Sequence, residues 1–136
     1  MAEYTPDYEL VETVGKHLFD TLPNGQFYKR LPDFKKIDFA KPIVVLGNSS
    51  LQQYTPAKGV LRVKPSLTVH IFGDVKNRQE AERLKSQVFN YLIKLHNVGS
   101  YSFELDPNYT ANYDELEQED NLQLCHGTLD VTYRVF

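Results

Sequence analysis

Residues 61–71 form the pattern that most constrains the fold of this chain. Apolar side chains alternate there with polar ones, and the apolar positions are Leu61, Val63, Leu67, Val69 and Ile71. This alternation predicts a β-strand with one face in the core and the other in water. Pro65 has no N–H to donate, so we expect that half of the strand at a sheet edge or a bulge. Because an edge can accept another chain, Pro65 is a candidate interface residue.

Two segments have the periodicity of amphipathic helices. The first is predicted over residues 6–22, since Pro6 suits a first helical turn and apolar residues then recur every four positions at Leu10, Val14, Leu18 and Leu22. The second is predicted over residues 77–96, where Asn77 and Glu80 have the spacing of a capping box. We therefore expect two helices, which flank the alternating strand in the sequence.

Three shorter segments have the composition of strands. Residues 27–30 and 43–46 are each predicted to form a short strand, and residues 101–105 a third. The Gly47-Asn48-Ser49-Ser50 segment lacks the second glycine, the lysine and the helix of a phosphate-binding loop. It is therefore predicted to be a turn that ends the strand at residue 46.

The C-terminal part of the chain is predicted to hold one long strand that begins at Leu122. Its apolar residues change phase between Leu124 and Leu129, which predicts a bulge at Gly127. The polar and acidic residues 106–121 that precede it are predicted to be a long loop.

Together these elements indicate an α+β fold. We expect a mixed or antiparallel sheet of about four to five strands, with two helices packed on one face. The length of 136 residues fits a single domain, residues 1–136, which buries roughly two thirds of its extended-chain surface.

Composition and charge argue against several classes of protein. The net charge is −3 and the 15 Lys and Arg residues are scattered, so a basic patch for specific binding of nucleic acid is not expected. The single cysteine and an N-terminus without a signal-peptide pattern predict an intracellular protein without internal disulfides. The apolar runs are too short to span a bilayer, so no membrane association is expected.

The histidines and the cysteine are the residues most able to carry chemistry. Cys125 and His126 are neighbours in a predicted strand and point to opposite faces, so they cannot share one metal ion. A small hydrolase that uses His126 or His70 is the rival hypothesis, but neither residue has the surrounding spacing of a known catalytic motif. We expect no enzyme activity, no catalytic residue, no cofactor and no metal site.

An acidic segment in the predicted loop is the main candidate for an interaction. Its carboxylates belong to Asp114, Glu115, Glu117, Glu119 and Asp120. They could bind a divalent cation, form one side of a charged interface, line a channel or simply be solvated. Tyr109 and Tyr113 lie just before them, and tyrosine beside charge is typical of protein interfaces. These residues join Pro65 as candidate interface residues.

Several local sequences, in this order and spacing, resemble one protein family. They are an N-terminal helix ending in Leu-Pro, Tyr28–Pro32, Pro42–Gly47, Leu67–Phe72, the helix with Glu80-Ala81, and His126–Val135. The chain resembles the tail terminators, also called tail completion proteins, of long-tailed bacteriophages. The resemblance covers nearly the whole chain. It rests on the order and spacing of these sequence segments more than on any single segment.

The resemblance implies a structural virion protein without catalytic residues. Such a subunit forms a homo-oligomeric ring, typically a hexamer, that caps the tail tube protein and joins the tail to the head through a connector or neck protein. DNA passes through the ring without specific binding, and assembly occurs in the host cytoplasm. The acidic segment is longer than the family leads one to expect, so a neck or head completion role stays open. A monomeric adaptor that binds clients with an edge strand is the other alternative.

Overall fold

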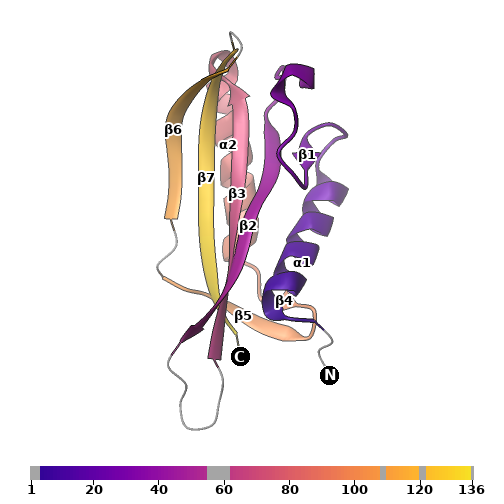
Figure 1. Ribbon diagram of the computed structural model, residues 1–136, viewed down its shortest axis with the longest axis vertical. Coiled ribbons are helices and arrows are strands. Elements are labelled where there is room, and N and C mark those ends of the chain that lie inside the picture. Colours follow the sequence, from indigo (N-terminus) through magenta and orange to yellow (C-terminus); the bar gives the residue numbers. More distant parts are fainter. Residues whose placement is uncertain (1–3, 55–61, 108–109, 120–121, 136) are drawn as a thin grey trace.

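The computed structural model describes residues 4–54, 62–107, 110–119 and 122–135. In that part of the chain, two α-helices pack on one face of a mixed sheet of seven strands (Figure 1). In chain order the elements are α1 Pro6–Thr21, β1 Phe27–Tyr28, a 3-10 helix Phe34–Lys36, β2 Ile43–Tyr54, β3 Arg62–Asp74, a 3-10 helix Val75–Asn77, α2 Arg78–Ile93, β4 Asn97–Val98, β5 Tyr101–Leu105, β6 Thr110–Glu119 and β7 Leu122–Val135. The expected α+β class is confirmed, as is the placement of both helices.

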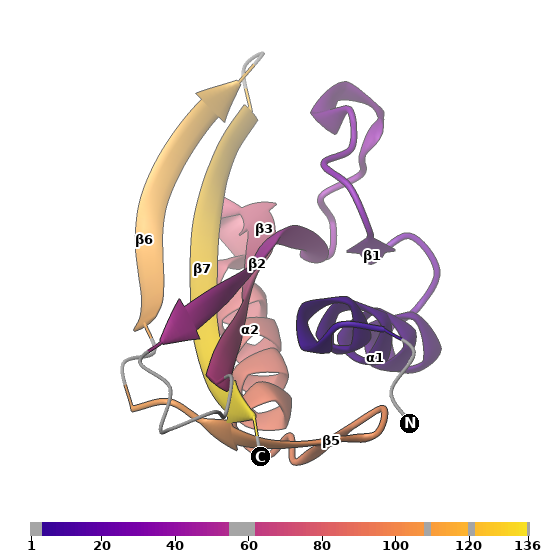
Figure 2. The ribbon, with the colours of Figure 1, turned by 60° about the horizontal axis from the view of Figure 1, so that its bottom comes forward.

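The sheet has more strands than the four to five expected, because β4 and β6 were not predicted. The strand order is β1-β2-β3-β7-β5-β4, and β6 also pairs with β7. β1 runs parallel to β2, while the other pairs are antiparallel. β5 and β6 therefore share one edge of β7, with β6 along its first part and β5 along its last residues. In both ribbon views β6 and α1 lie on opposite sides of the molecule (Figures 1 and 2).

Both helices form where the apolar periodicity places them, but the cap of the second helix differs from the expectation. Asn77 occupies the N-cap position of α2 without a side-chain cap hydrogen bond. Its Nδ2 instead donates to the carbonyl oxygen of Ala40 at 3.2 Å, which ties the start of α2 to the 31–41 segment. The predicted capping box is thus wrong, and α2 ends at Ile93 instead of residue 96. No helix in the described ranges combines the length and apolar character needed to cross a membrane.

The predicted turn at Gly47-Asn48-Ser49-Ser50 is wrong, because β2 continues through it to Tyr54. A register shift between Leu46 and Ser49 marks a bulge, after which Ser50 pairs with Ser66 of β3. Gly47 allows the close approach of the two strands: a Cβ atom there would lie 2.8 Å from Nε2 of His70. Cross-strand hydrogen bonds to β3 therefore override the local turn composition.

The prediction of a loop over residues 106–121 is wrong in the same way, because Thr110–Glu119 form strand β6. β6 pairs with β7 from Thr110 opposite Asp130 to Glu119 opposite Leu122. The ladder contains a register shift between Asn112 and Glu115. The composition of residues 110–119 does not predict a strand. They form one because the backbone of β7 supplies their hydrogen-bond partners.

Gly127 does not form the predicted bulge. β7 pairs with β3 in one continuous register, with Gly127 opposite Ile71, and the nearby irregularity lies in β6. Leu124 is buried in a different cluster from Leu129, on the other face of the sheet. The apolar residues of β7 thus change phase because the strand crosses from one core to another.

Pro65 lies where the ladder between β3 and β7 stops. It is buried and pairs with Leu51 of β2. In the described register the pairing of β3 with β7 begins at the next residue, Ser66, opposite Thr132. The missing N–H of Pro65 thus falls at the end of that ladder, in agreement with the expectation of an edge at this half of the strand.

The larger core lies between the sheet and the two helices. Leu10, Val14 and Leu18 of α1 pack there with residues of α2 such as Leu92. Among the described side chains Tyr133 of β7 is the largest that is fully buried, and it donates its hydroxyl to the carbonyl oxygen of Leu92 at 2.5 Å. This contact fixes the end of α2 on the sheet.

A second, smaller core covers part of the opposite face. It contains Phe34, Phe39, Ile43, Val45, Phe72 and Leu124. The 31–41 segment supplies Phe34 and Phe39, whose rings meet edge to face at a centroid distance of 5.6 Å. These aromatic side chains hold the 31–41 segment against the sheet.

Candidate functional site

A row of polar side chains crosses the sheet on the face opposite the helices. Ser50 of β2 and Ser66 of β3 are joined by a hydrogen bond between their hydroxyls. Thr68 of β3 donates to Asp130 of β7, and His70 bonds His126 further along the same two strands. In each of these contacts a polar side chain of the row bonds another side chain of the same row.

The two histidines of this row form a close pair. Nδ1 of His70 lies 2.8 Å from Nε2 of His126, and the Thr128 hydroxyl lies 3.4 Å from the same Nε2. The ring of His126 also stacks on Phe72, at a centroid distance of 4.3 Å. His70 and Thr128 thus both meet the same ring nitrogen of His126.

Cys125 lies on the other side of the sheet from this pair. It is fully buried in the helix-side core, and its thiol donates to the carbonyl oxygen of Gly73 at 3.5 Å. The expectation that Cys125 and His126 face opposite ways is confirmed. Among the described side chains, no group of three or more His, Cys, Asp or Glu residues is placed to hold a metal ion.

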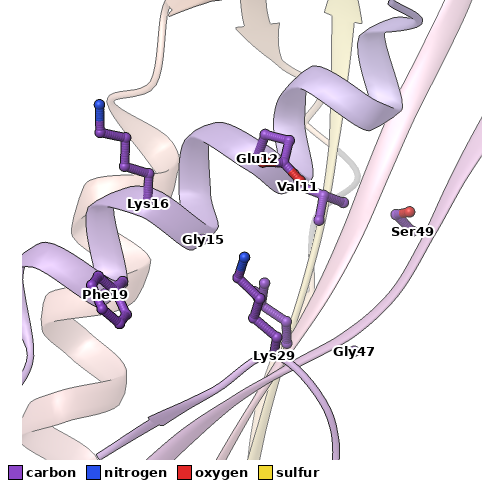
Figure 3. A pocket seen from close by; sticks show the side chains of 9 residues that line it. Val11, Glu12, Gly15, Lys16, Phe19, Lys29, Gly47 and Ser49 are labelled. Atoms are coloured by element: carbon purple, nitrogen blue, oxygen red, sulfur yellow. The ribbon is translucent and has the colours of Figure 1, made fainter. Parts of the chain in front are cut away.

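A hollow of about 460 Å³ separates α1 from the outer edge of β2 (Figure 3). On the helix side Phe19 stands at its opening, and 68% of that side chain is exposed. Lys29 extends its amine toward α1 from the segment after β1. The complete lining is Val11, Glu12, Gly15, Lys16, Phe19, Lys29, Leu46, Gly47 and Ser49.

A second hollow, of about 560 Å³, adjoins the first around Lys29, Leu46 and Gly47. It leads toward the paired histidines and is bordered by Leu31, which is 68% exposed. The two hollows thus follow β2 around its bulge, from the α1 side to the polar face. They offer apolar contact area beside a strand edge.

The edge of β2 is open where these hollows lie. β1 pairs with β2 at Val44 and Val45. In the described ranges no strand pairs with the outer edge of β2 beyond Val45. An edge strand with open hydrogen-bonding groups is a template for another chain.

The predicted acidic candidates belong to the other edge of the sheet. Tyr113, Asp114, Glu115, Glu117 and Glu119 are residues of β6, while Tyr109 and Asp120 lie outside the described residues. Within the part of the chain that the structure describes, β7 is the only strand that pairs with β6. The structure therefore places these candidates on a strand edge, and β7 separates them from Pro65 on β3.

One buried charge was missed by the sequence analysis. Asp106, 2% exposed, lies 2.9 Å from Nζ of Lys64 and 3.6 Å from Nε of Arg134. Its backbone N–H also bonds the Thr132 carbonyl at 2.8 Å. These contacts tie β3, β7 and the segment after β5 together, so we interpret Asp106 as a structural residue.

Phe19 and Lys29 were also missed, and only Phe19 carried a signal. It follows Leu18 and so falls off the four-residue line that marks the buried face of α1. An aromatic side chain at such a position is exposed unless something covers it. Lys29 becomes notable only when β1 brings it beside β2.

The comparisons with known proteins bear on the fold. No family model and no curated protein sequence matches the chain. Among solved structures it is similar to a chain described as "Virion of native gene transfer agent (GTA) particle", at a TM-score of 0.64 and 11% sequence identity. The likeness covers 97% of this chain and 98% of that chain. At this identity the likeness shows that the two chains share a fold over their full lengths.

Proposed function

We propose that this protein is a structural component of a phage-type virion, and that it forms a ring that caps the tail tube and joins the tail to the head. The fold likeness to a chain of a gene transfer agent virion carries this proposal, because it involves almost the whole of both chains. The resemblance of the sequence to tail terminators points to the same class of particle.

The shape of the sheet supports a role in assembly more than a role in chemistry. The β2 edge and the β6 edge are two different surfaces of the subunit, and a head-to-tail ring uses two such surfaces. On the polar face His70 and His126 bond each other between β3 and β7, within a row of hydrogen bonds that join neighbouring strands. The proposed role accordingly uses binding surfaces and no cofactor.

Native mass spectrometry of the purified chain tests this function, first alone and then with tail tube protein. We expect a closed oligomer, with six copies as the favoured size, in at least one condition. Electron microscopy of the mixture should then show the protein at one end of each tube, and capped tubes should stop growing. A chain that stays monomeric in both conditions and does not bind tube ends contradicts the proposal.

The open edge of β2 also favours a second candidate, a monomeric adaptor that adds a client strand to its sheet. The same measurements separate the two functions. An adaptor stays monomeric at all concentrations and binds its client with one-to-one stoichiometry, whereas a ring protein assembles with itself.

A further inference from the structure

We infer that the hollow between α1 and the β2 edge is the docking site for strand β6 of a second copy of this chain. The inference rests on the proposed ring and specifies the contact that closes it. The groove, defined by Val11, Gly15, Phe19, Lys29, Leu46 and Ser49, would receive β6 as an added strand.

The groove has the form of a strand-addition site. β1 pairs with β2 only as far as Val45. The hollow begins at the next residue of β2, Leu46, where β1 no longer lies beside that strand. A strand that enters there meets backbone groups of β2 on one side and the apolar side of Phe19 on the other (Figure 3). Backbone hydrogen bonds would hold it, and burial of Phe19 would add apolar contact.

The directions of the strands match this pairing. β2, β3, β7 and β6 are neighbours in the sheet, and each consecutive pair is antiparallel. Three reversals make β6 antiparallel to β2 within one subunit. Rotation about an axis close to the strand direction preserves these directions, so β6 of the next copy meets β2 as an antiparallel strand.

The contact is heterologous, since it joins one side of a subunit to the opposite side of the next. β6 and α1 lie on opposite sides in both ribbon views (Figures 1 and 2). Repetition of such a contact produces a ring when the rotation closes. A contact of β2 with β2, by contrast, would end at a dimer.

Charge identifies β6 as the occupant. Lys16 and Lys29 line the groove with Glu12, a sum of +1. β6 carries four acidic residues, Asp114, Glu115, Glu117 and Glu119, and no basic residue, a sum of −4. Opposite charges on two facing surfaces select the partner and its register.

Complementary charge-reversal variants test the contact. Lys16→Glu with Lys29→Glu alters the groove, and Glu115→Lys with Glu117→Lys alters the strand. Each variant should raise the protein concentration at half assembly by about tenfold or more, because the altered groove repels the acidic strand and the altered strand no longer carries the negative charge that the groove attracts. Native mass spectrometry measures the species, and circular dichroism confirms that each variant is folded.

Mixing the two variants provides the sharpest result. In the mixture the acidic groove of the first variant can receive the strand of the second, whose net charge has changed from −4 to zero, and the unaltered groove of the second can receive the unaltered strand of the first. No contact in an alternating ring then joins two surfaces of like net charge, so the mixture should assemble although neither variant does so alone. A single chain that carries all four reversals should also form rings again.

Cross-linking tests the same contact without a change of charge. Ser49→Cys combined with either Glu115→Cys or Glu117→Cys, in a Cys125→Ser background, should form disulfides between copies and yield covalent multimers on oxidation. Lys41→Glu with Lys94→Glu is the matched control for the charge reversals, since both lysines are exposed and neither lines the groove. This control should assemble like the wild type.

The outcomes separate the contact from the function. Suppose that the wild type forms rings. If both charge-reversal variants form them equally well, or if neither cysteine pair gives a cross-link, the groove-to-strand contact is wrong and the ring function is not affected. A wild-type chain that never forms a ring overturns the proposed function itself.

Discussion

The helix-covered face and the opposite face of the sheet differ in how completely they are packed. Among the residues whose burial the structure describes, 19 form one continuous apolar core under the helices, whereas six form the cluster on the opposite face. The remainder of that second face carries the polar row through Ser66, Thr68 and His70. The difference indicates that the helix side supplies most of the stability and leaves the other face and the sheet edges available for contacts.

The largest expected effect comes from a cavity on the helix-covered face. Leu10 is fully buried, so Leu10→Ala should lower the free energy of unfolding by about 2–5 kcal/mol. Leu31→Ala is the matched control, because Leu31 is 68% exposed, and its effect should stay within about 0.5 kcal/mol. Urea denaturation measures both. Equal losses would contradict the difference in packing.

Two adjacent valines of β2 compare the faces directly. Val44 belongs to the larger core and Val45 to the smaller one, where it also borders a hollow. We expect Val44→Ala to cost about 2–3 kcal/mol and Val45→Ala about 1–2 kcal/mol, since a site beside open space can relax more easily. Thermal and urea unfolding of the two variants test this order. If Val45→Ala lowered the free energy of unfolding more than Val44→Ala, the smaller core would be the more tightly packed of the two, contrary to this expectation.

Tyr133 gives the helix-covered face a dependence on pH. Burial raises the pKa of this phenol, and the charge of Tyr91 contributes in the same direction. The unfolded chain releases this proton near pH 10 while the folded chain keeps it, so the folded state binds more protons and its stability falls as the pH rises above 10. Tyr133→Phe should cost about 1 kcal/mol at pH 8 through the lost hydrogen bond to Leu92.

The same variant should lose less stability than the wild type between about pH 10 and pH 12. Urea midpoints at several pH values measure the slopes, and Tyr8→Phe, at a side chain that is 47% exposed, serves as the control. Parallel slopes for Tyr133→Phe and the wild type would show that Tyr133 ionises alike in both states.

The smallest effect is expected in the polar row. Ser50→Ala removes one hydroxyl of an exposed hydrogen bond to Ser66, so stability should change by less than about 0.5 kcal/mol. Differential scanning calorimetry can place this limit. A loss comparable to that of Leu10→Ala would mean that the polar face is as important to folding as the helix face.

Local pattern was sufficient where one face of an element determines its structure. The four-residue repeat of Leu10, Val14 and Leu18 predicted α1, and the alternation up to Ile71 predicted β3. Both elements bury one face, and that burial leaves a direct periodic trace in the sequence. The α+β class and the position of the helices followed from these traces.

Pattern failed where a neighbouring strand determines the structure. Gly47–Ser50 and the residues of β6 are polar, and each was predicted to be a turn or loop. They form strands because β3 and β7 supply hydrogen-bond partners from distant parts of the chain. The candidate site was affected in the same way: the acidic residues were found, but their position on a sheet edge was not.

The helices, the central strand, the fold class and the positions of the charged residues could be predicted from the order of amino acids. Tertiary structure alone decided that Leu124 and Leu129 belong to different cores, that Lys29 lies beside an open edge of β2, and that β6 is a strand at all. The physical reason is that periodic burial acts between near neighbours in the chain, whereas strand pairing and edge formation depend on which distant segments meet.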